Sequence, residues 1–324
     1  MPFFDVIVPV YNRPHELQEL LATLAQQTFR DFQVLVLEDG STIPSRDVCL
    51  AWASDVPLVY RAQPNAGPAA ARNAAAYSPE CTAEYLVFVD SDCLLPADYL
   101  ALSYHFARAH PNVACYGGPD RAHPSFTPIQ KAISYSMTSL LTTGGIRGKA
   151  EQAEKFTPRT FNMTVARQAF QTVHGFHAHL RYGEDVDLSL RLREAGYQLA
   201  LCREAFVYHK RRTSFRQFFW QVYHSGAARW GLALSHRDSL RLVHLLPSAA
   251  VVLLVGALAL SWTPLGQWLL GAAALYALAL FCDALRCTHA LRVALLSVVA
   301  SAIQVIAYGV GFLVQMAQYP RRTR

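Results

Sequence analysis

The stretch Glu84–Cys93, EYLVFVDSDC, decides the fold class. Its residues 85–89 are uniformly apolar and run directly into two carboxylates, Asp90 and Asp92, separated by one residue. Short, wholly apolar segments are typical of strands buried on both faces, as in a parallel sheet covered by helices. Side chains two residues apart on a strand point the same way. We therefore expect Asp90 and Asp92 to converge on one point, where a cation would offset their repulsion.

The preceding residues repeat a pattern of strands and helices. Apolar strands are expected at 5–12 (DVIVPVYN), 32–41 (FQVLVLEDGS) and 56–63 (VPLVYRAQ), with helices at 15–28 and 67–78. The order is interpreted as β-α-β-α-β-α-β, an α/β fold with a mostly parallel, Rossmann-like sheet and flanking helices. Ligands bind such sheets outside the carboxyl ends of the strands. The polar clusters YNRP, EDGST, NAGPAAARN and DSDC all follow strands, so one rim should collect them.

The last third of the chain differs in composition from the rest. The 324 residues are 52% hydrophobic and 16% charged with a net charge of +6, which is too apolar for an ordinary soluble enzyme. From Leu242 onward only one acid remains, Asp283. Three runs, about 245–262, 265–282 and 291–317, approach the ~20 residues needed to cross a bilayer.

This contrast predicts two domains and a topology. An α/β domain is expected at residues 1–235, and a membrane domain with two or three hydrophobic helices at 241–319. Basic residues flank the first two runs, in YHKRRTSFR and at Arg286 and Arg292, so these runs should form a hairpin with both ends cytoplasmic. The N-terminus does not resemble a signal peptide, so the α/β domain should lie in the cytoplasm, at the inner membrane. The third run either spans the membrane or lies along its interface.

Several ordered motifs give the chain a family resemblance. They are VIVPVYNRP, LEDGST, NAGPAAARN, FVDSDC, FNMTV and GFHAHLRYGEDVDLSLRLREAGY. Each motif is weak alone, but their order and separations resemble the glycosyltransferase family 2 enzymes of the GT-A fold over residues 3 to about 230. The resemblance implies a transferase that takes a sugar from a nucleotide-diphosphate donor, UDP- or GDP-linked.

The resemblance also implies a donor site on the rim. The family's acid that holds the nucleotide base matches Asp39; the alternative is that Asp39 caps the next helix. Arg72 lies near the start of a helix that Gly67 opens to close approach, a good environment for a diphosphate; the alternative is a solvated arginine. The expected nucleotide-sugar contacts are Pro9, Tyr11, Asn12, Glu38, Asp39, Asn65, Gly67, Arg72, Asp90 and Ser91.

A divalent cation, Mg²⁺ or Mn²⁺, is the expected cofactor. Asp90 and Asp92 match the family's DxD motif, and hard cations prefer carboxylate oxygens. His209 ends the apolar run FVYH, where related enzymes complete the metal shell with a histidine. A lone histidine at a strand end is as consistent with a structural role, so both interpretations stay open for His209.

Catalysis is expected at the pair Glu184 and Asp185. These acids open an amphipathic helix, where the helix dipole favours acids whatever their function. In the family, one acid of this pair takes the proton from the acceptor hydroxyl, and direct attack inverts the anomeric centre. We expect Asp185 to be the base, with Glu184 as its helper or as an acceptor contact.

The acceptor is expected to be lipid-linked or a membrane-proximal glycan, to which one sugar is added. Processive polysaccharide synthases, the first alternative, carry a Q-x-x-R-W motif; here the corresponding stretch is GAARW, with Gly226 in place of Gln. A non-catalytic nucleotide-sugar-binding membrane scaffold is the second alternative. Residues 117–159 occupy the position of the family's variable acceptor-recognition loop. The positive residues cluster beside the apolar runs, which argues against a nucleic-acid partner.

Overall fold

The computed structural model describes residues 1–143, 156–236 and 239–322, which form two compact units. The first unit contains Met1–His123 and Ala150–Lys210, and the second contains Pro124–Lys149 and Arg211–Arg324. The expected boundary near residue 235 differs from this division. The segment after residue 123 and the helix Phe215–Ser235 (α9) group with the C-terminal helices, because their apolar faces pack there and not on the sheet.

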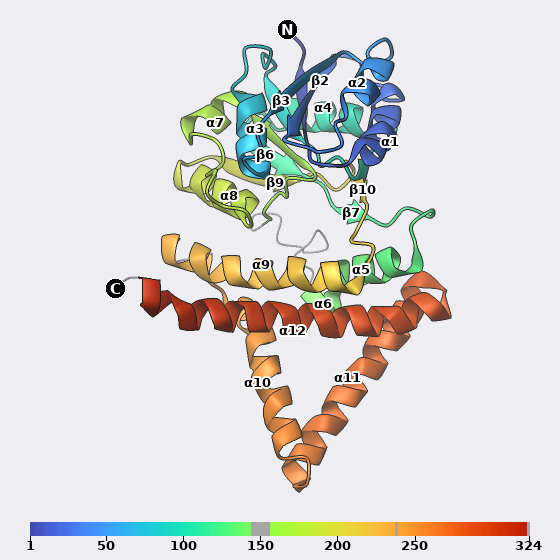
Figure 1. Ribbon diagram of the computed structural model, residues 1–324, viewed down its shortest axis with the longest axis vertical. Helices are drawn as coiled ribbons and strands as arrows, with labels where there is room; N and C mark the ends of the chain where they lie inside the picture. The colour runs from blue at the N-terminus through green and yellow to red at the C-terminus, as the bar shows by residue number, and fades with distance from the viewer. Residues whose placement is uncertain (144–155, 237–238, 323–324) are drawn as a thin grey trace. The chain divides into compact units, whose positions relative to one another are not determined.

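A seven-stranded sheet forms the centre of the first unit, in the order β3-β2-β1-β4-β8-β6-β9 (Figure 1). The first four of these strands are parallel, whereas β8 is antiparallel to both of its neighbours. The expectation of a mostly parallel sheet is therefore confirmed. The strands are β1 (Phe4–Val10), β2 (Phe32–Asp39), β3 (Leu58–Gln63), β4 (Tyr85–Phe88), β6 (Val113–Gly117), β8 (Met163–Ala166) and β9 (Gln198–Leu201).

Apolar residues on both faces of the central strands explain why helices cover both sides. In β1, Val6 and Val8 face a core that contains the leucines of α1, whereas Ile7 faces a second core that contains Leu188 and Leu192 of α8. This alternation follows from the two-residue period of a strand. The helices of this unit are α1 (Pro14–Ala25), α2 (Arg46–Trp52), α3 (Pro68–Ala76), α4 (Tyr99–Ala109), α7 (Arg167–Thr172) and α8 (Glu184–Glu194).

A small second sheet lies at the end of β4 and contributes to the candidate site. Its three strands are β5 (Cys93–Leu94), β10 (Val207–His209) and β7 (Asp120–Arg121), in the order β5-β10-β7. The antiparallel pairing of β10 with β5 sets His209 opposite Cys93. A histidine more than a hundred residues away in sequence is thereby brought to the DSDC segment.

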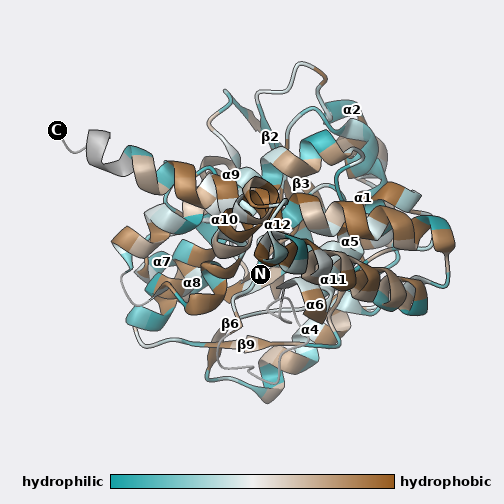
Figure 2. Ribbon diagram, turned by 90° about the horizontal axis from the view of Figure 1, so that it is seen from below, coloured by the Kyte–Doolittle hydropathy of each residue, from teal (hydrophilic) through white to brown (hydrophobic). Residues whose placement is uncertain are grey.

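The second unit is helical. Figure 1 shows α9 and α12 side by side, with α10 and α11 leaving them as a V, and in Figure 2 α11 is hydrophobic over most of its length. By length and composition, α11 and residues 291–318 of α12 are able to cross a membrane, whereas α10 has only 14 residues. The helices are α5 (Pro128–Thr138), α6 (Leu140–Thr143), α9 (Phe215–Ser235), the 3-10 turn η3 (Leu242–His244), α10 (Leu246–Ala259), α11 (Pro264–Thr288) and α12 (Leu291–Arg322).

Candidate functional site

The two aspartates of the DSDC segment lie in a turn and not on a strand. Strand β4 ends at Phe88, and the Cys93 amide donates a hydrogen bond to the Asp90 carbonyl oxygen at 3.0 Å, which closes the turn. The alternation argument for convergence is therefore wrong, because it requires extended backbone through Asp92. Asp90 and Asp92 instead contact different partners.

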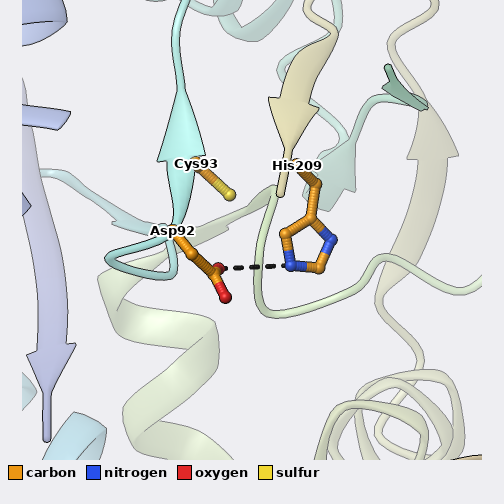
Figure 3. A group of neighbouring side chains, drawn as sticks. All are labelled: Asp92, Cys93 and His209. Carbon is orange, nitrogen blue, oxygen red and sulfur yellow. Dashed lines mark ion pairs between the residues drawn. The ribbon is translucent and has the colours of Figure 1, made fainter. Parts of the chain in front are cut away.

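Asp92 forms a cluster with Cys93 and His209 (Figure 3). One potential ligand atom from each of these residues lies within 4.8 Å of the others, and His209 Nε2 is 3.2 Å from Asp92 Oδ1. The ring of Phe161 stacks on the His209 imidazole with centroids 4.6 Å apart, which fixes the orientation of the ring. Asp90 is not a member of this cluster among the residues that the structure describes.

The chemistry of this cluster fits a hard divalent cation. A carboxylate and an imidazole are suitable ligands for Mn²⁺, whereas the Cys93 thiol is a soft donor that is hydrogen-bonded to the Phe161 carbonyl oxygen at 3.6 Å. Burial raises the pKa of the Asp92 carboxyl, but His209 and the Arg13 guanidinium outweigh it and hold the pKa well below its usual range. Asp92 is therefore ionised at neutral pH, as a metal ligand must be.

Arg72 joins Asp90 to the acid pair on α8. This arginine is only 3% exposed, and its two terminal nitrogens lie 2.6 Å from Asp90 Oδ1 and 3.1 Å from Glu184 Oε1. The alternative of a solvated arginine is thereby wrong. A buried guanidinium between two acids aligns the end of β4 with the start of α8.

The neighbouring acids Glu184 and Asp185 have different environments. Burial raises the pKa of the Glu184 carboxyl to about 7, with Asp185 acting in the same direction and Arg72 opposing. Asp185 Oδ2 lies 3.3 Å from Arg159 Nη1, so a positive charge adjoins the second acid. Two adjacent carboxyl groups in unlike surroundings are suited to different roles.

The raised pKa of Glu184 predicts a pH-dependent stability. Between its ordinary value of 4.5 and about 7, the folded chain holds a proton that the unfolded chain has lost, so the free energy of unfolding should fall as the pH rises through this window. The total change is on the order of 3 kcal/mol. Glu184→Gln cannot titrate, so thermal unfolding of the detergent-solubilised chain should depend less on pH between 5 and 8 than in the wild type.

The exposed Glu194 at the other end of α8 provides the matched control for this measurement. Glu194→Gln should retain the wild-type pH dependence. An unchanged slope in Glu184→Gln would contradict the assignment of a buried, protonated carboxyl to this position.

Asp39 is 4% exposed and organises the loop before α3. Its Oδ1 accepts hydrogen bonds from Gln63 Nε2 at 2.8 Å and from the Ala66 amide at 2.9 Å, and its Oδ2 accepts from the Gly67 amide at 2.9 Å. Gly67 has a φ of 90°, which favours glycine at this position. Oδ2 has a lone pair left for a donor on a base, so recognition of the nucleotide base by Asp39 stays a prediction.

Glu38 and Asn12 hold the loop that follows β2. Glu38 accepts hydrogen bonds from the Ser41 hydroxyl and from the Ser45 amide, the latter at 2.5 Å. Asn12 Oδ1 accepts from the amides of Thr42 and Ile43 at 2.8 and 3.0 Å. Both residues therefore shape the rim, and a direct contact of either with the donor stays a prediction.

The other expected donor contacts are spread along the same rim. Tyr11 is 51% exposed at the end of β1, Ser91 is buried in the DSDC turn, and the Asn65 amide group donates to the Asp39 carbonyl oxygen at 2.9 Å. Pro9 lies within β1 and is half-buried. Tyr11 and Asn65 are exposed and therefore accessible to a ligand.

Two arginines of the site were not among the expected residues. Arg13 pairs with Asp92, and Arg159 pairs with Asp185. Arg13 follows β1 within the YNRP cluster, so its position in the sequence was sufficient to predict that it lies on the rim. Arg159 follows a Gly-, Pro- and Thr-rich segment without periodicity, and no local pattern marks it.

Comparison with known proteins agrees with this geometry. The family model for glycosyl transferase family 2 matches residues 5–182. The chain is 25% identical over 275 residues to the succinoglycan biosynthesis protein ExoA of Rhizobium meliloti (strain 1021), covering 81% of each protein. It is 24% identical over 230 residues to the O-antigen chain rhamnosyltransferase WbaN of Salmonella anatum, covering 70% of this chain and 72% of that protein.

Solved structures share the fold. The mannosyltransferase PcManGT from Pyrobaculum calidifontis, in complex with GDP-Man and Mn²⁺, aligns with a TM-score of 0.60 and 19% identity, covering 100% of this chain and 88% of that one. Residues 1–349 of S. aureus TarS align with a TM-score of 0.52 and 18% identity, covering 100% and 92%. Because the family model matches more than half of the chain and the fold agrees, this chain belongs to glycosyl transferase family 2 and is a glycosyltransferase of the GT-A fold.

Proposed function

We propose that this enzyme is a metal-dependent, inverting glycosyltransferase that moves one sugar from a UDP- or GDP-linked donor to a lipid-linked or membrane-proximal glycan. The observation that carries the proposal is the contact between Asp92 and His209 at the end of β4, 3.2 Å apart, beside the buried Arg72. The Asp92 carboxylate and the His209 imidazole are suitable ligands for a hard divalent cation, and such a cation would in turn bind a diphosphate.

The residues of the rim divide the work of the reaction. Asp92 and His209 would hold the cation, which neutralises the charge that develops on the departing nucleoside diphosphate. Asp185 takes the proton of the acceptor hydroxyl as its oxygen forms a bond to the anomeric carbon. The bond from that carbon to the diphosphate oxygen breaks at the same time, and its electron pair leaves with the diphosphate. Arg72 keeps Asp90 and the start of α8 in place for this step.

The choice of donor rests on the relatives. PcManGT was solved with GDP-Man and Mn²⁺, and TarS residues 1–349 with UDP at a TM-score of 0.50. Both of these ligands are nucleoside diphosphates or their sugars, and a rim with the charges described above suits either base.

Transfer of a single sugar is supported by the packing of the GAARW segment. A Cβ at Gly226 would lie 2.2 Å from the Tyr308 carbonyl oxygen of α12, so the glutamine of processive synthases cannot be accommodated here. Trp230 packs edge-on against Phe312 with centroids 5.6 Å apart. The segment thus packs α9 against α12 through Gly226 and Trp230.

Membrane association supports the choice of acceptor. Two helices of the second unit are long and apolar enough to cross a bilayer, and large apolar side chains such as Leu253, Leu258 and Leu275 are more than half exposed. We place the enzyme at the inner membrane with its α/β unit in the cytoplasm, where nucleotide sugars are available. An acceptor attached to the same membrane would then share the location of the enzyme.

A thermal-shift screen tests the proposed donor class. UDP or GDP with Mn²⁺ should raise the unfolding temperature of the detergent-solubilised chain, because a ligand at 100 times its Kd stabilises the folded state by about 2.7 kcal/mol. The same nucleotide without a divalent cation should give a smaller shift, and nucleosides without phosphate serve as the control. Stabilisation by none of the nucleoside diphosphates would contradict the proposal.

Product analysis separates the two modes of transfer. With the stabilising donor and a lipid-linked acceptor, mass spectrometry should show one added sugar. A ladder of products from one donor would identify a processive enzyme instead.

A further inference from the structure

Helices α9 and α12 share a hydrophobic core and approach most closely at a pair of reciprocal glycine contacts. A Cβ at Gly226 would lie 2.2 Å from the Tyr308 carbonyl oxygen, and a Cβ at Gly311 would lie 2.1 Å from the Tyr223 carbonyl oxygen. Each glycine therefore lies against the carbonyl group of the residue that comes three positions before the other glycine. This register brings the backbones together with the helices running in the same direction (Figure 1). The direction of α12 is consequently tied to that of α9.

Helix α9 is unsuited to the hydrocarbon core. Its 21 residues include Arg216 in the first turn, with His224 and Arg229 further along. An arginine at the centre of a membrane-spanning helix costs about 2.5–3.5 kcal/mol on insertion scales. Arg216 is exposed, and α9 is not among the described helices that are apolar enough to cross a membrane. An element with this composition belongs at the membrane surface or in water.

Helix α12 nevertheless exposes an apolar stripe. Positions separated by four, three and four residues lie on one face of a helix. On the buried side, the hydroxyls of Ser297 and Ser301 donate to carbonyl oxygens one turn back, at 2.8 and 2.7 Å. The buried side also carries apolar residues, among them Val293, Ala300 and Ala307, so α12 is apolar on both faces, unlike a helix at the surface of a soluble protein. The exposed stripe consists of Leu295, Val299, Ala302 and Ile306.

We propose that α12 lies in the boundary between headgroups and acyl chains, with this stripe toward the acyl chains, and that only α10 and α11 enter the hydrocarbon. Length and composition alone would allow α12 to cross, but its packing along α9 does not. Arg286 and Arg292 lie on either side of the junction between α11 and α12, where anionic headgroups attract them. The exposed stripe of α12 therefore contacts the acyl chains of the lipid bilayer.

Depth measurements on proteoliposomes test this orientation. Nitroxide labels are placed one at a time at Leu295→Cys, Val299→Cys and Ile306→Cys in the full chain, with the exposed Cys282 and Cys287 replaced by Ala. The vesicles contain phosphatidylethanolamine and phosphatidylglycerol, and power-saturation EPR gives the depth of each label. We expect equal depths for the three labels. A spanning α12 would give depths that differ by about 16 Å between residues 295 and 306.

Labels on α10 separate this inference from the proposed membrane insertion on which it rests. Leu253→Cys and Leu258→Cys occupy exposed positions and should report different depths within the hydrocarbon. If both are immersed but α12 shows a depth gradient, the interfacial position of α12 is wrong and membrane insertion stands. If the α10 labels are in water, both ideas fail. The parent protein without an introduced cysteine measures the background from the five buried thiols.

Discussion

Replacing Asp92 with Asn should lower the rate of sugar transfer by at least about 10³-fold, equivalent to about 4 kcal/mol of transition-state stabilisation. Asp92 is the one carboxylate of the cluster with His209 and Cys93 in the described part of the chain. An amide keeps the size of the side chain and removes the negative charge on which binding of a divalent cation depends. Transfer should therefore be lost together with high-affinity Mn²⁺ binding, which EPR of free Mn²⁺ measures without any turnover.

Asp98→Asn is the matched control for this experiment. Asp98 lies six residues further along, is exposed, and makes no side-chain capping hydrogen bond at the start of α4. It should retain transfer and Mn²⁺ affinity. If Asp92→Asn transfers sugar at the wild-type rate, the cluster at the end of β4 is not a metal site. Loss of transfer with Mn²⁺ affinity unchanged would equally remove Asp92 from the metal shell.

The sheet was predictable from sequence because its central strands carry apolar residues on both faces. Residues such as Val6, Ile7 and Val8 are buried on opposite faces, and only a sheet with helices on both sides buries them all. Because the residues before Asp90 are uniformly apolar, the sequence does not show where β4 ends. Nothing in VFVDSDC shows that the backbone leaves the strand after Phe88, so the divergence of Asp90 from Asp92 depends on tertiary structure.

The partners of the charged residues were less predictable than the residues themselves. Arg72 and Glu184 are 112 positions apart, and their contact depends on the docking of α8 beside α3. Local patterns marked each acid but carried no information about which guanidinium would reach it. The proposed orientation of α12 also depends on tertiary structure, since its composition fits a membrane span and its packing on α9, at the two glycine contacts and between Trp230 and Phe312, cannot be read from the sequence.

Asp185→Asn should reduce kcat by about 10³-fold while the donor binds as before. General-base catalysis contributes about 10²–10⁴-fold, and an amide cannot take the proton of the acceptor hydroxyl. Arg159 lies 3.3 Å from Asp185 and Arg72 lies 3.1 Å from Glu184, so a guanidinium adjoins each acid, but the raised pKa of Glu184 leaves that group largely protonated below pH 7. Single-turnover transfer and nucleotide titration of the same protein separate the loss of chemistry from any loss of binding.

Glu184→Gln distinguishes the roles of the two acids. An amide resembles the protonated carboxyl in shape and hydrogen bonding, so this variant should retain more activity than Asp185→Asn, with a loss nearer to about 10-fold from its weakened contact with Arg72. The pH profile of transfer is the decisive readout. If Asp185 is the base, Glu184→Gln keeps the acidic limb of the wild-type profile. If Glu184→Gln instead lowers activity by about the 10³-fold expected for Asp185→Asn, and the acidic limb of the pH profile disappears, then Glu184 is the base and the two roles are exchanged.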